Sequence, residues 1–238
     1  MNGLFADLES YNEVARLLGD EFHILRYDCR GQGKSPRPES IYKLSDHVSD
    51  LEGLVQDLGI TSSYLLGLSN GARVALEYAR KNPEKSLAVV ACDTYAYPSE
   101  ILKLKLNSWL KAFKEGGAYH RFDVATPWIW GESVVNEKPE LVKSYRIRAK
   151  DLEEHVFNGL VLGAMEGIIP LNEINCPIHF IAGREDVLTP PYLHQKMFDE
   201  CSNKSLKNKF SIVPGGHASL LEYPETVVTE IVPFLRSL

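Results

Sequence analysis

The stretch SYLLGLSNGARVALEYA, residues 63–79, constrains the fold most strongly, because an apolar run gives way to helical spacing across a turn of only a few residues. The apolar residues up to Leu68 are typical of a buried strand, and the spacing after Gly71 predicts a helix that continues to Lys81. A strand, a tight turn and a helix in direct succession form the repeating unit of parallel sheets. If this unit recurs along the chain, the fold class is α/β.

The alternation of strand and helix does recur over most of the chain. Strands are predicted at 22–28, 62–69, 86–94, 177–186 and 208–216, and helices at 8–18, 45–58, 71–81, 191–201 and from about residue 223. Because helices separate successive strands, we expect right-handed crossovers and a mostly parallel sheet that is covered on both faces. The predicted architecture is therefore a doubly wound sheet.

Residues 97–170 interrupt this alternation. The segment is helical in propensity, is rich in aromatic residues and contains no strand-like run. Because both of its ends return to the same core, it is predicted to be a helical cap inserted between two strands. We expect a core formed by residues 1–96 and 171–238 and a cap formed by residues 97–170. The cap holds ten Lys and Arg against ten Asp and Glu, so its net charge indicates neither an anionic nor a cationic substrate.

Composition narrows the expected partners and location. The 238 residues carry a net charge of −6 and no basic stretch interleaved with aromatics, so nucleic acid is not an expected partner. Neither a membrane span nor a secretion signal is predicted, because no apolar run is long enough and MNGLFADLES lacks a leader pattern. The four cysteines are scattered and lack metal-ligand spacing, which favours free thiols, no metal site and a cytoplasmic location. Nothing in the sequence indicates the oligomeric state.

Three reactive side chains follow predicted strands, at the edge where the carboxyl ends of parallel strands meet. Ser69 lies in GLSNG, which matches the Gly-x-Ser-x-Gly nucleophile elbow. Of the seven histidines, His217 alone follows a strand end, and it is the candidate base for the serine hydroxyl. Asp186 is the candidate acid that would fix the histidine ring and stabilise its charged form. The sequence therefore predicts a Ser-Asp-His catalytic triad.

Each of these assignments has an alternative. Asp93 also ends a strand and is the rival acid, while the side chain of Glu185 is expected to point the other way. The serine could simply occupy a tight turn, the histidine a surface loop, and Asp186 the cap of the next helix. In the catalytic interpretation, the amide of Asn70 at the start of a helix faces the oxygen of the attacked carbonyl.

Together these segments resemble the α/β-hydrolase fold superfamily. The resemblance rests on GLSNG, YDCRGQGKS, GREDVLTP and PGGHASLLEYPE, and it covers essentially the whole chain outside residues 97–170. Family members carry Asp-x-Arg-Gly-x-Gly-x-Ser after an early strand, and residues 28–35 fill that pattern here. The short capped form, with the cap phrase TPWIWGES, is similar to enol-lactone hydrolases and small esterases. The resemblance implies a serine nucleophile and no cofactor.

The N-terminal residues depart from the family pattern. The resemblance implies an oxyanion-hole amide after a central strand, and here that amide would come from Leu4, which follows Asn2-Gly3. Only Met1 precedes that pair, so we expect an N-terminally shortened version of a longer chain and a loose oxyanion hole. Without the central strand, Tyr27 and Leu65 would face each other across about 10 Å, twice the usual spacing of about 4.8 Å. Direct hydrogen bonding between their strands would contradict this gap.

The leading interpretation is a serine hydrolase that cleaves a carboxylic ester, lactone or thioester through an acyl-enzyme on Ser69. A carbon-carbon bond hydrolase, an acyltransferase and an aminopeptidase remain alternatives on the same fold, as does a non-catalytic binding protein. The expected partner is a small-molecule acyl substrate. Its pocket is expected between the elbow and the cap, lined by Trp109, Trp128, Trp130, Phe157 and Met165.

Overall fold

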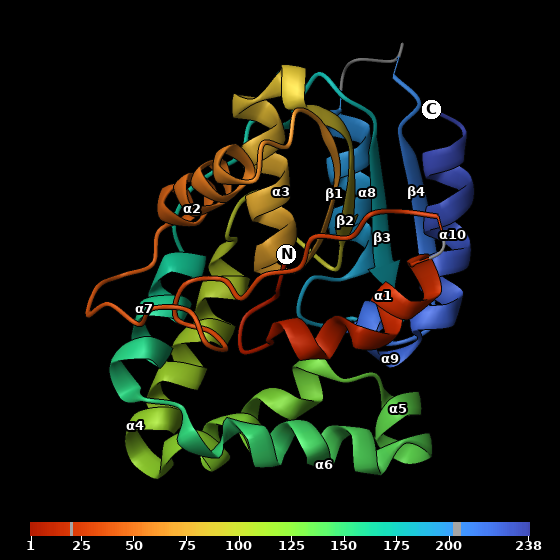
Figure 1. Cartoon of the computed structure of the whole chain (residues 1–238). Helices are drawn as coiled ribbons and strands as arrows, with labels where there is room; N and C mark the ends of the chain where they lie inside the picture. Colours follow the sequence, from red (N-terminus) through yellow and green to blue (C-terminus); the bar gives the residue numbers. More distant parts are fainter. Residues whose placement is uncertain (20, 202–205) are drawn as a thin grey trace.

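A computed structural model describes residues 1–19, 21–201 and 206–238 (Figure 1). These residues form a four-stranded parallel sheet in the order β1-β2-β3-β4. The strands are β1 (Ser63–Leu68), β2 (Ser86–Cys92), β3 (Ile178–Gly183) and β4 (Lys209–Val213). Helices separate successive strands, so the α/β class and the parallel sheet predicted from the sequence are confirmed.

Helices cover both faces of the sheet. They are α1 (Asn12–Leu18), α2 (Leu44–Asp57), α3 (Asn70–Lys81), α8 (Pro191–Glu200) and α10 (Pro224–Arg236). On one face, Val89 and Phe180 pack with α2, α3 and α8, and on the other face Val90 and Ile181 pack with α1 and α10. Figure 1 shows α3 and α10 on opposite sides of the strands. Strand residues therefore alternate between two apolar cores, which explains why the strands are apolar throughout.

Residues 22–28, predicted as a strand, have no regular secondary structure. Ile24 and Leu25 in this segment are 39% and 42% exposed. A strand is held by a ladder of hydrogen bonds to a neighbour, and within the described residues this segment forms no such ladder. The prediction of a strand here is wrong because apolar character alone does not supply a pairing partner.

Besides β2, the carboxyl end of β1 also forms hydrogen bonds with Met1. The Met1 ammonium donates to the Leu66 carbonyl at 2.7 Å, and the Leu68 amide donates to the Met1 carbonyl at 3.3 Å. Within the described residues, no hydrogen bond joins Tyr27 to Leu65. The expected gap between these two segments is therefore not contradicted.

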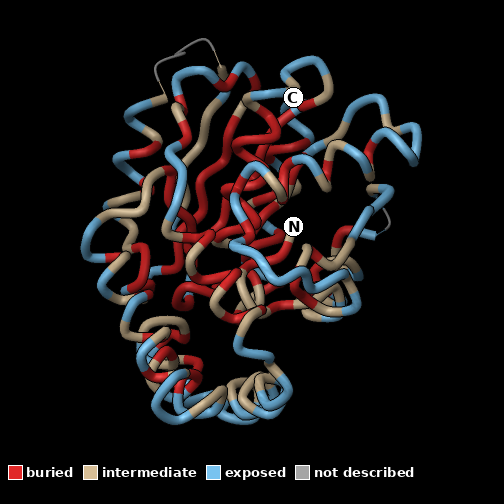
Figure 2. Tube along the Cα trace, turned by 90° about the vertical axis from the view of Figure 1, so that its left-hand side faces the viewer, coloured by how far each residue is buried: buried red, intermediate tan, exposed pale blue. Residues whose placement is uncertain are grey.

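The chain between β2 and β3 forms helices α4 (Glu100–Ile129), α5 (Glu132–Glu137), α6 (Pro139–Arg148) and α7 (Glu154–Ala164). Figure 1 shows these helices gathered at the carboxyl ends of the strands, the position expected for a cap. Figure 2 shows buried residues concentrated around the sheet, with much of the outer side of the cap exposed. The short elements are η1 (Leu8–Tyr11), η2 (Pro83–Lys85), η3 (Ala149–Asp151), η4 (Leu171–Glu173) and α9 (Ser219–Glu222). The helical character predicted for residues 97–170 agrees with α4, α5, α6, η3 and α7. The domain boundaries stay a prediction.

One buried arginine ties the base of the cap to the core. Arg73 on α3 donates from Nη1 to the carbonyl of Ala164 at 3.2 Å. Its Nη2 donates to the carbonyls of Glu166 at 2.6 Å and Gly167 at 2.9 Å. The last carbonyls of a helix lack partners within the helix, so Arg73 satisfies one carbonyl at the end of α7 and two in the segment that follows it.

Helix α4 is broken at Gly117, where φ is 71° and ψ is −165°. This conformation lies outside the regions open to residues with a side chain. The break redirects the chain, so that Trp109 before it and Phe122 after it are both buried. A single glycine therefore lets one long helical segment contribute two walls to the interior of the cap.

Replacing Gly117 with alanine is expected to lower the free energy of unfolding by about 1–3 kcal/mol, because the new residue must hold a sparsely populated backbone conformation. No atom lies within 4 Å of the added Cβ, so the effect is conformational rather than steric. Urea unfolding measures it. The matched control is Gly53→Ala in α2, where the Cβ also meets open space and alanine should stabilise the helix by up to about 1 kcal/mol. Equal effects at the two positions would contradict backbone strain at Gly117.

Candidate active site

The turn between β1 and α3 holds Ser69 in a strained conformation, with φ 55° and ψ −121°. A Cβ at Gly67 would lie 2.4 Å from the carbonyl oxygen of Gly71. A Cβ at Gly71 would lie 2.3 Å from the carbonyl oxygen of Met1. Neither approach tolerates a side chain, which is the reason the elbow motif requires small residues at these two positions. The turn places the half-buried serine at the carboxyl edge of the sheet.

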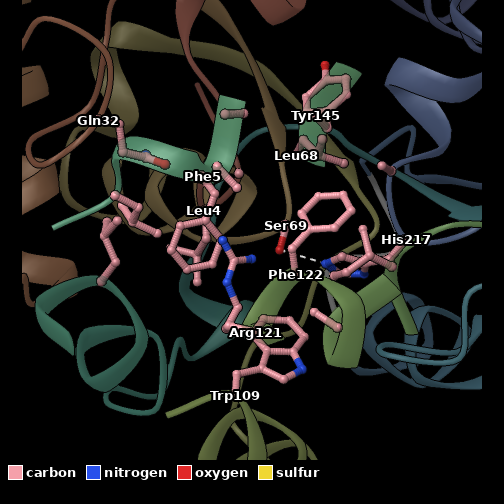
Figure 3. A pocket seen from close by; sticks show the side chains of 18 of the residues that line it. Leu4, Phe5, Gln32, Leu68, Ser69, Trp109, Arg121, Phe122, Tyr145 and His217 are labelled. Atoms are coloured by element: carbon pink, nitrogen blue, oxygen red, sulfur yellow. Dashed lines mark hydrogen bonds between the residues drawn. The ribbon is translucent and has the colours of Figure 1, made fainter. Parts of the chain in front are cut away.

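His217 lies between Ser69 and Asp186. Its Nε2 is 2.8 Å from Ser69 Oγ, the contact drawn as a dashed line in Figure 3, and its Nδ1 is 3.0 Å from Asp186 Oδ2. With the proton on Nδ1, that nitrogen donates to the carboxylate and Nε2 is free to accept the serine proton. The three residues follow β1, β3 and β4, so the parallel topology brings together the three side chains that the sequence singles out.

The Asp186 carboxylate is held by the turn that follows β3. Its Oδ1 accepts the backbone amides of Leu188 at 2.8 Å and Thr189 at 2.9 Å, and its Oδ2 accepts the Thr189 hydroxyl at 2.8 Å. Burial by itself would raise the pKa of Asp186, but the charge and hydrogen bond of His217, with the Thr189 amide, lower that pKa below its ordinary value. Asp186 is therefore ionised and fixed. The role of Thr189 was not predicted, although an Asp side chain in a turn commonly accepts nearby backbone amides.

The rival acids are engaged elsewhere. Asp93 accepts the Gly183 amide at 2.7 Å and the Ser219 hydroxyl at 2.7 Å, and burial raises the pKa of its carboxyl well above the ordinary value. Glu185 accepts the Ser133 amide at 2.9 Å, and hydrogen bonds from Ser133 lower the pKa of Glu185. Among the described contacts of these two carboxyl groups, none is with His217. Asp186 is thus the acid that contacts the histidine ring.

Two backbone amides near Ser69 have no acceptor among the described residues. Asn70 is the first residue of α3, where a helix leaves its amides unpaired. The Leu4 amide is the second, and Leu4 lines the cavity beside Ser69. Gly3 packs against the elbow, since a Cβ there would lie 3.4 Å from the Ser69 Cβ. Two backbone amides without an acceptor, from separate parts of the chain, therefore lie near the serine.

A cavity of about 440 Å³ lies between the elbow and the cap, lined by Ser69 and His217. Of the residues predicted to line it, Trp109 and Trp130 do. The other three, Trp128, Phe157 and Met165, do not line it and belong instead to the apolar cluster that joins the cap to the core. Phe157, for example, is stacked on Phe113 at 4.4 Å and on Phe5 at 5.5 Å between ring centres. These three side chains lie behind the cavity wall, because aromatic content alone does not separate lining residues from those packed behind them, and which residues bind a substrate stays a prediction.

Phe5, Gln32 and Arg121 also line the cavity, although no sequence pattern places them there (Figure 3). Phe5 has a φ of 66°, rare for a residue with a side chain, which no sequence pattern indicates. Gln32 lies inside the Gly-rich loop after Asp28, at a position that the family pattern leaves unspecified. Arg121 is one of ten basic residues in a cap of balanced charge, so only its burial distinguishes it.

Glu222 fastens the loop that carries His217. Its Oε2 accepts the Gly216 amide at 2.7 Å and its Oε1 accepts the Gly131 amide at 3.4 Å. The His217 amide in turn donates to the Ile129 carbonyl at 2.7 Å. Burial raises the pKa of Glu222 to about 7. The histidine loop is thus attached to the cap as well as to the core.

The contribution of Glu222 to stability is expected to fall as the pH rises from about 4.5 to about 7. In this range the folded state keeps the proton on Glu222, whereas the unfolded chain, with a pKa of 4.5, releases it. The contribution is complete below pH 4.5 and lost above pH 7, and at about 1.4 kcal/mol per unit it amounts to about 3 kcal/mol. Thermal unfolding of the protein and of Glu222→Gln between pH 4.5 and 8 measures it. Identical slopes in the two proteins would contradict a buried, protonated Glu222.

The comparison with protein families decides the wider assignment. The sequence model of the alpha/beta hydrolase fold matches residues 1–224. The chain belongs to the alpha/beta hydrolase family. This membership supports a hydrolase, and the resemblance to the α/β-hydrolase fold superfamily is confirmed.

Individual relatives of this hydrolase are distant. The 2-(acetamidomethylene)succinate hydrolase of Mesorhizobium japonicum is 29% identical over 118 residues, which is 48% of this chain and 42% of that protein. The 3-oxoadipate enol-lactonase 2 of Acinetobacter baylyi is 23% identical over 226 residues, 94% of this chain and 82% of that one. A thermophilic esterase from Thermogutta terrifontis, solved with malate bound, is 26% identical with a TM-score of 0.88, covering 99% and 88% of the two chains. The similarity to enol-lactone hydrolases and small esterases is therefore confirmed.

Cys29, Cys92, Cys176 and Cys201 are free, as predicted. Within residues 1–19, 21–201 and 206–238, no three His, Cys, Asp or Glu side chains are grouped so as to hold a metal ion. Over the same ranges, none of the helices has the length and apolar character needed to cross a membrane.

Proposed function

We propose that this hydrolase cleaves a carboxylic ester, lactone or thioester of a small molecule through an acyl-enzyme on Ser69. The observation that carries the proposal is the 2.8 Å contact between His217 Nε2 and Ser69 Oγ at the wall of a cavity. A serine hydroxyl is a weak nucleophile at neutral pH and becomes effective when a base within hydrogen-bond reach takes its proton. The esterase and enol-lactonase among the relatives support this substrate class.

In the proposed reaction, Ser69 Oγ attacks the carbonyl carbon while its proton passes to His217 Nε2. Asp186 holds the ring through Nδ1 and stabilises the imidazolium. The oxygen of the tetrahedral intermediate accepts hydrogen bonds from the amides of Leu4 and Asn70. His217 then gives the proton to the leaving oxygen or sulfur, and the acyl group stays on Ser69. Water, deprotonated by the same histidine, releases the acid and restores the serine.

Covalent labelling with a fluorophosphonate probe tests this proposal. We expect one label per chain, located on Ser69, with none in Ser69→Ala and strongly reduced labelling in His217→Ala. The matched control is Ser63→Ala on the same strand, at a serine that does not line the cavity, and it should label normally. A folded protein that neither labels nor releases an acyl product would contradict the proposal and favour a non-catalytic binding protein.

A further inference from the structure

The wall of the cavity contains a buried arginine without a partner. Arg121, on the part of α4 that follows the break at Gly117, is 4% exposed. Its Nε and Nη2 are shielded from solvent and have no hydrogen-bond partner, and among the described residues no carboxylate forms an ion pair with it. Burial lowers the pKa of Arg121 to about 10, so the guanidinium still carries its charge at neutral pH. An unpaired buried charge is strongly unfavourable, so its retention needs an explanation.

Aromatic rings surround the guanidinium but leave its hydrogen-bonding capacity unmet. Its Cζ lies 4.3 Å from the centre of the Phe5 ring and 5.5 Å from that of Phe157. Ring faces attract a cation without accepting its N–H groups in ordinary hydrogen bonds. Figure 3 shows the guanidinium directed into the cavity, beside Phe5 and on the side facing Ser69. The third nitrogen, Nη1, also has no hydrogen bond among the described residues and, unlike Nε and Nη2, is not shielded, so an acceptor in the cavity can reach the guanidinium through Nη1.

The other arginines at the cavity already have acidic partners. Arg37 pairs with Glu153 at 2.7 Å, and Arg148 pairs with Asp7 at 3.4 Å. Both arginines are substantially exposed, so the carboxylates compensate their charges and solvent screens them. Arg121 is accordingly the unmatched positive charge among the described residues that line the cavity.

Two further lining residues also have unpartnered polar atoms. The indole N–H of Trp109 is a donor and the side-chain carbonyl of Gln32 is an acceptor, and both are buried. The unmet donors thus outnumber the unmet acceptors, and the strongest of them is charged. The Trp109 and Gln32 atoms are shielded, so Arg121 is the one of these three groups that a ligand in the cavity reaches, through Nη1, and an anionic acceptor matches its charge.

We propose that Arg121 binds a carboxylate of the substrate, so that the enzyme prefers esters or lactones that carry a free carboxylate besides the reacting carbonyl. This inference rests on the proposed function, because Ser69 supplies the reacting atom. A planar guanidinium matches a carboxylate in geometry, and a cavity sheltered from water strengthens their attraction. The volume of about 440 Å³ suits a small molecule of this kind.

Matched pairs of esters test the preference. Mono-(4-nitrophenyl) adipate against 4-nitrophenyl hexanoate places the carboxylate in the acyl part, and 3-carboxyphenyl hexanoate against phenyl hexanoate places it in the alcohol part. For one of the pairs, the ratio of kcat/KM between charged and neutral ester should fall by about 10- to 100-fold in Arg121→Met, mostly through KM. Arg121→Lys should lose less, because it keeps the charge and loses the fork. The control Arg146→Met, at an exposed cap arginine paired with Asp123 and not lining the cavity, should leave both ratios unchanged.

Binding to the Ser69→Ala protein gives a readout that does not depend on turnover. Isothermal titration should show adipate binding more tightly than hexanoate, and Arg121→Met in the same background should remove that difference. If the esters are hydrolysed with the same ratios in wild type and Arg121→Met, and adipate binding is unaffected, Arg121 does not bind a carboxylate although the hydrolase proposal stands. If no ester is hydrolysed and Ser69 does not label, the proposed function fails, and the titration still decides the role of Arg121. Should Arg121→Met not fold, Arg121→Lys carries the same comparison.

Discussion

Replacing Ser69 with alanine is expected to lower kcat/KM for any ester that the protein hydrolyses by at least about 10⁴-fold, because the variant cannot form the acyl-enzyme. Removing the serine of such a triad has an effect of up to about 10⁶-fold on kcat, and the remaining rate comes from the oxyanion hole and substrate binding. Here the same loss should follow from His217→Ala, since the serine proton would have no acceptor. The double variant should be hardly slower than either single variant, because the residues act as a unit.

Initial rates with 4-nitrophenyl hexanoate measure this loss, with thermal unfolding as the check that the variants fold. Ser69→Gly provides a structural control, because glycine adopts a φ of 55° without strain and should be more stable than Ser69→Ala. Both variants should be equally inactive. An alanine variant that keeps more than about one hundredth of the wild-type rate would contradict the nucleophile assignment.

Replacing Asp186 with asparagine is expected to lower kcat by about 10⁴-fold while the fold persists. Asparagine can still accept the amides of Leu188 and Thr189 through its carbonyl oxygen. Its NH₂ group would then face His217 Nδ1, which favours the tautomer with the proton on Nε2. In that tautomer the ring cannot accept the proton of Ser69. The loss should appear in kcat, with KM for the ester nearly unchanged.

Asp93→Asn is the matched control for Asp186→Asn, since both residues are buried aspartates that follow neighbouring strands. Asp93 accepts from Gly183 and Ser219, and not from the catalytic candidate His217. Its loss should therefore lower the unfolding temperature and affect kcat far less than Asp186→Asn does. The reverse ranking of the two kcat values would identify Asp93 as the acid and contradict the assignment made from the contacts.

The order of strands and helices was predictable because each segment carries its own periodic pattern. The apolar run ending at Leu68 and the helical spacing after Gly71 identify β1 and α3 without reference to the rest of the chain. The positions of Ser69, Asp186 and His217 follow from the same reasoning, since the carboxyl ends of parallel strands converge. Local patterns and one topological rule were enough to bring these three side chains together.

Features that depend on the tertiary neighbours of a segment were not predictable from its own sequence. Residues 22–28 have the composition of a strand but no ladder partner, and nothing within the segment reveals that. Phe157 and Trp109 are both aromatic cap residues, yet only Trp109 reaches the cavity. The isolation of Arg121 depends on the absence of a nearby carboxylate in three dimensions, which a balanced count of charges conceals.

The hydrogen bond from the His217 amide to the Ile129 carbonyl limits how freely the insertion can be exchanged. The backbones also approach closely at the residue before His217, where a Cβ at Gly216 would lie 2.4 Å from the Gly131 nitrogen. A chimera that grafts a foreign cap onto this core must reproduce the path of residues 129–131, or the imidazole loses part of its support. Chimeras in which the two parent proteins share the backbone conformation of residues 129–131 should be active. Chimeras in which this conformation differs should fold but have a lower catalytic rate.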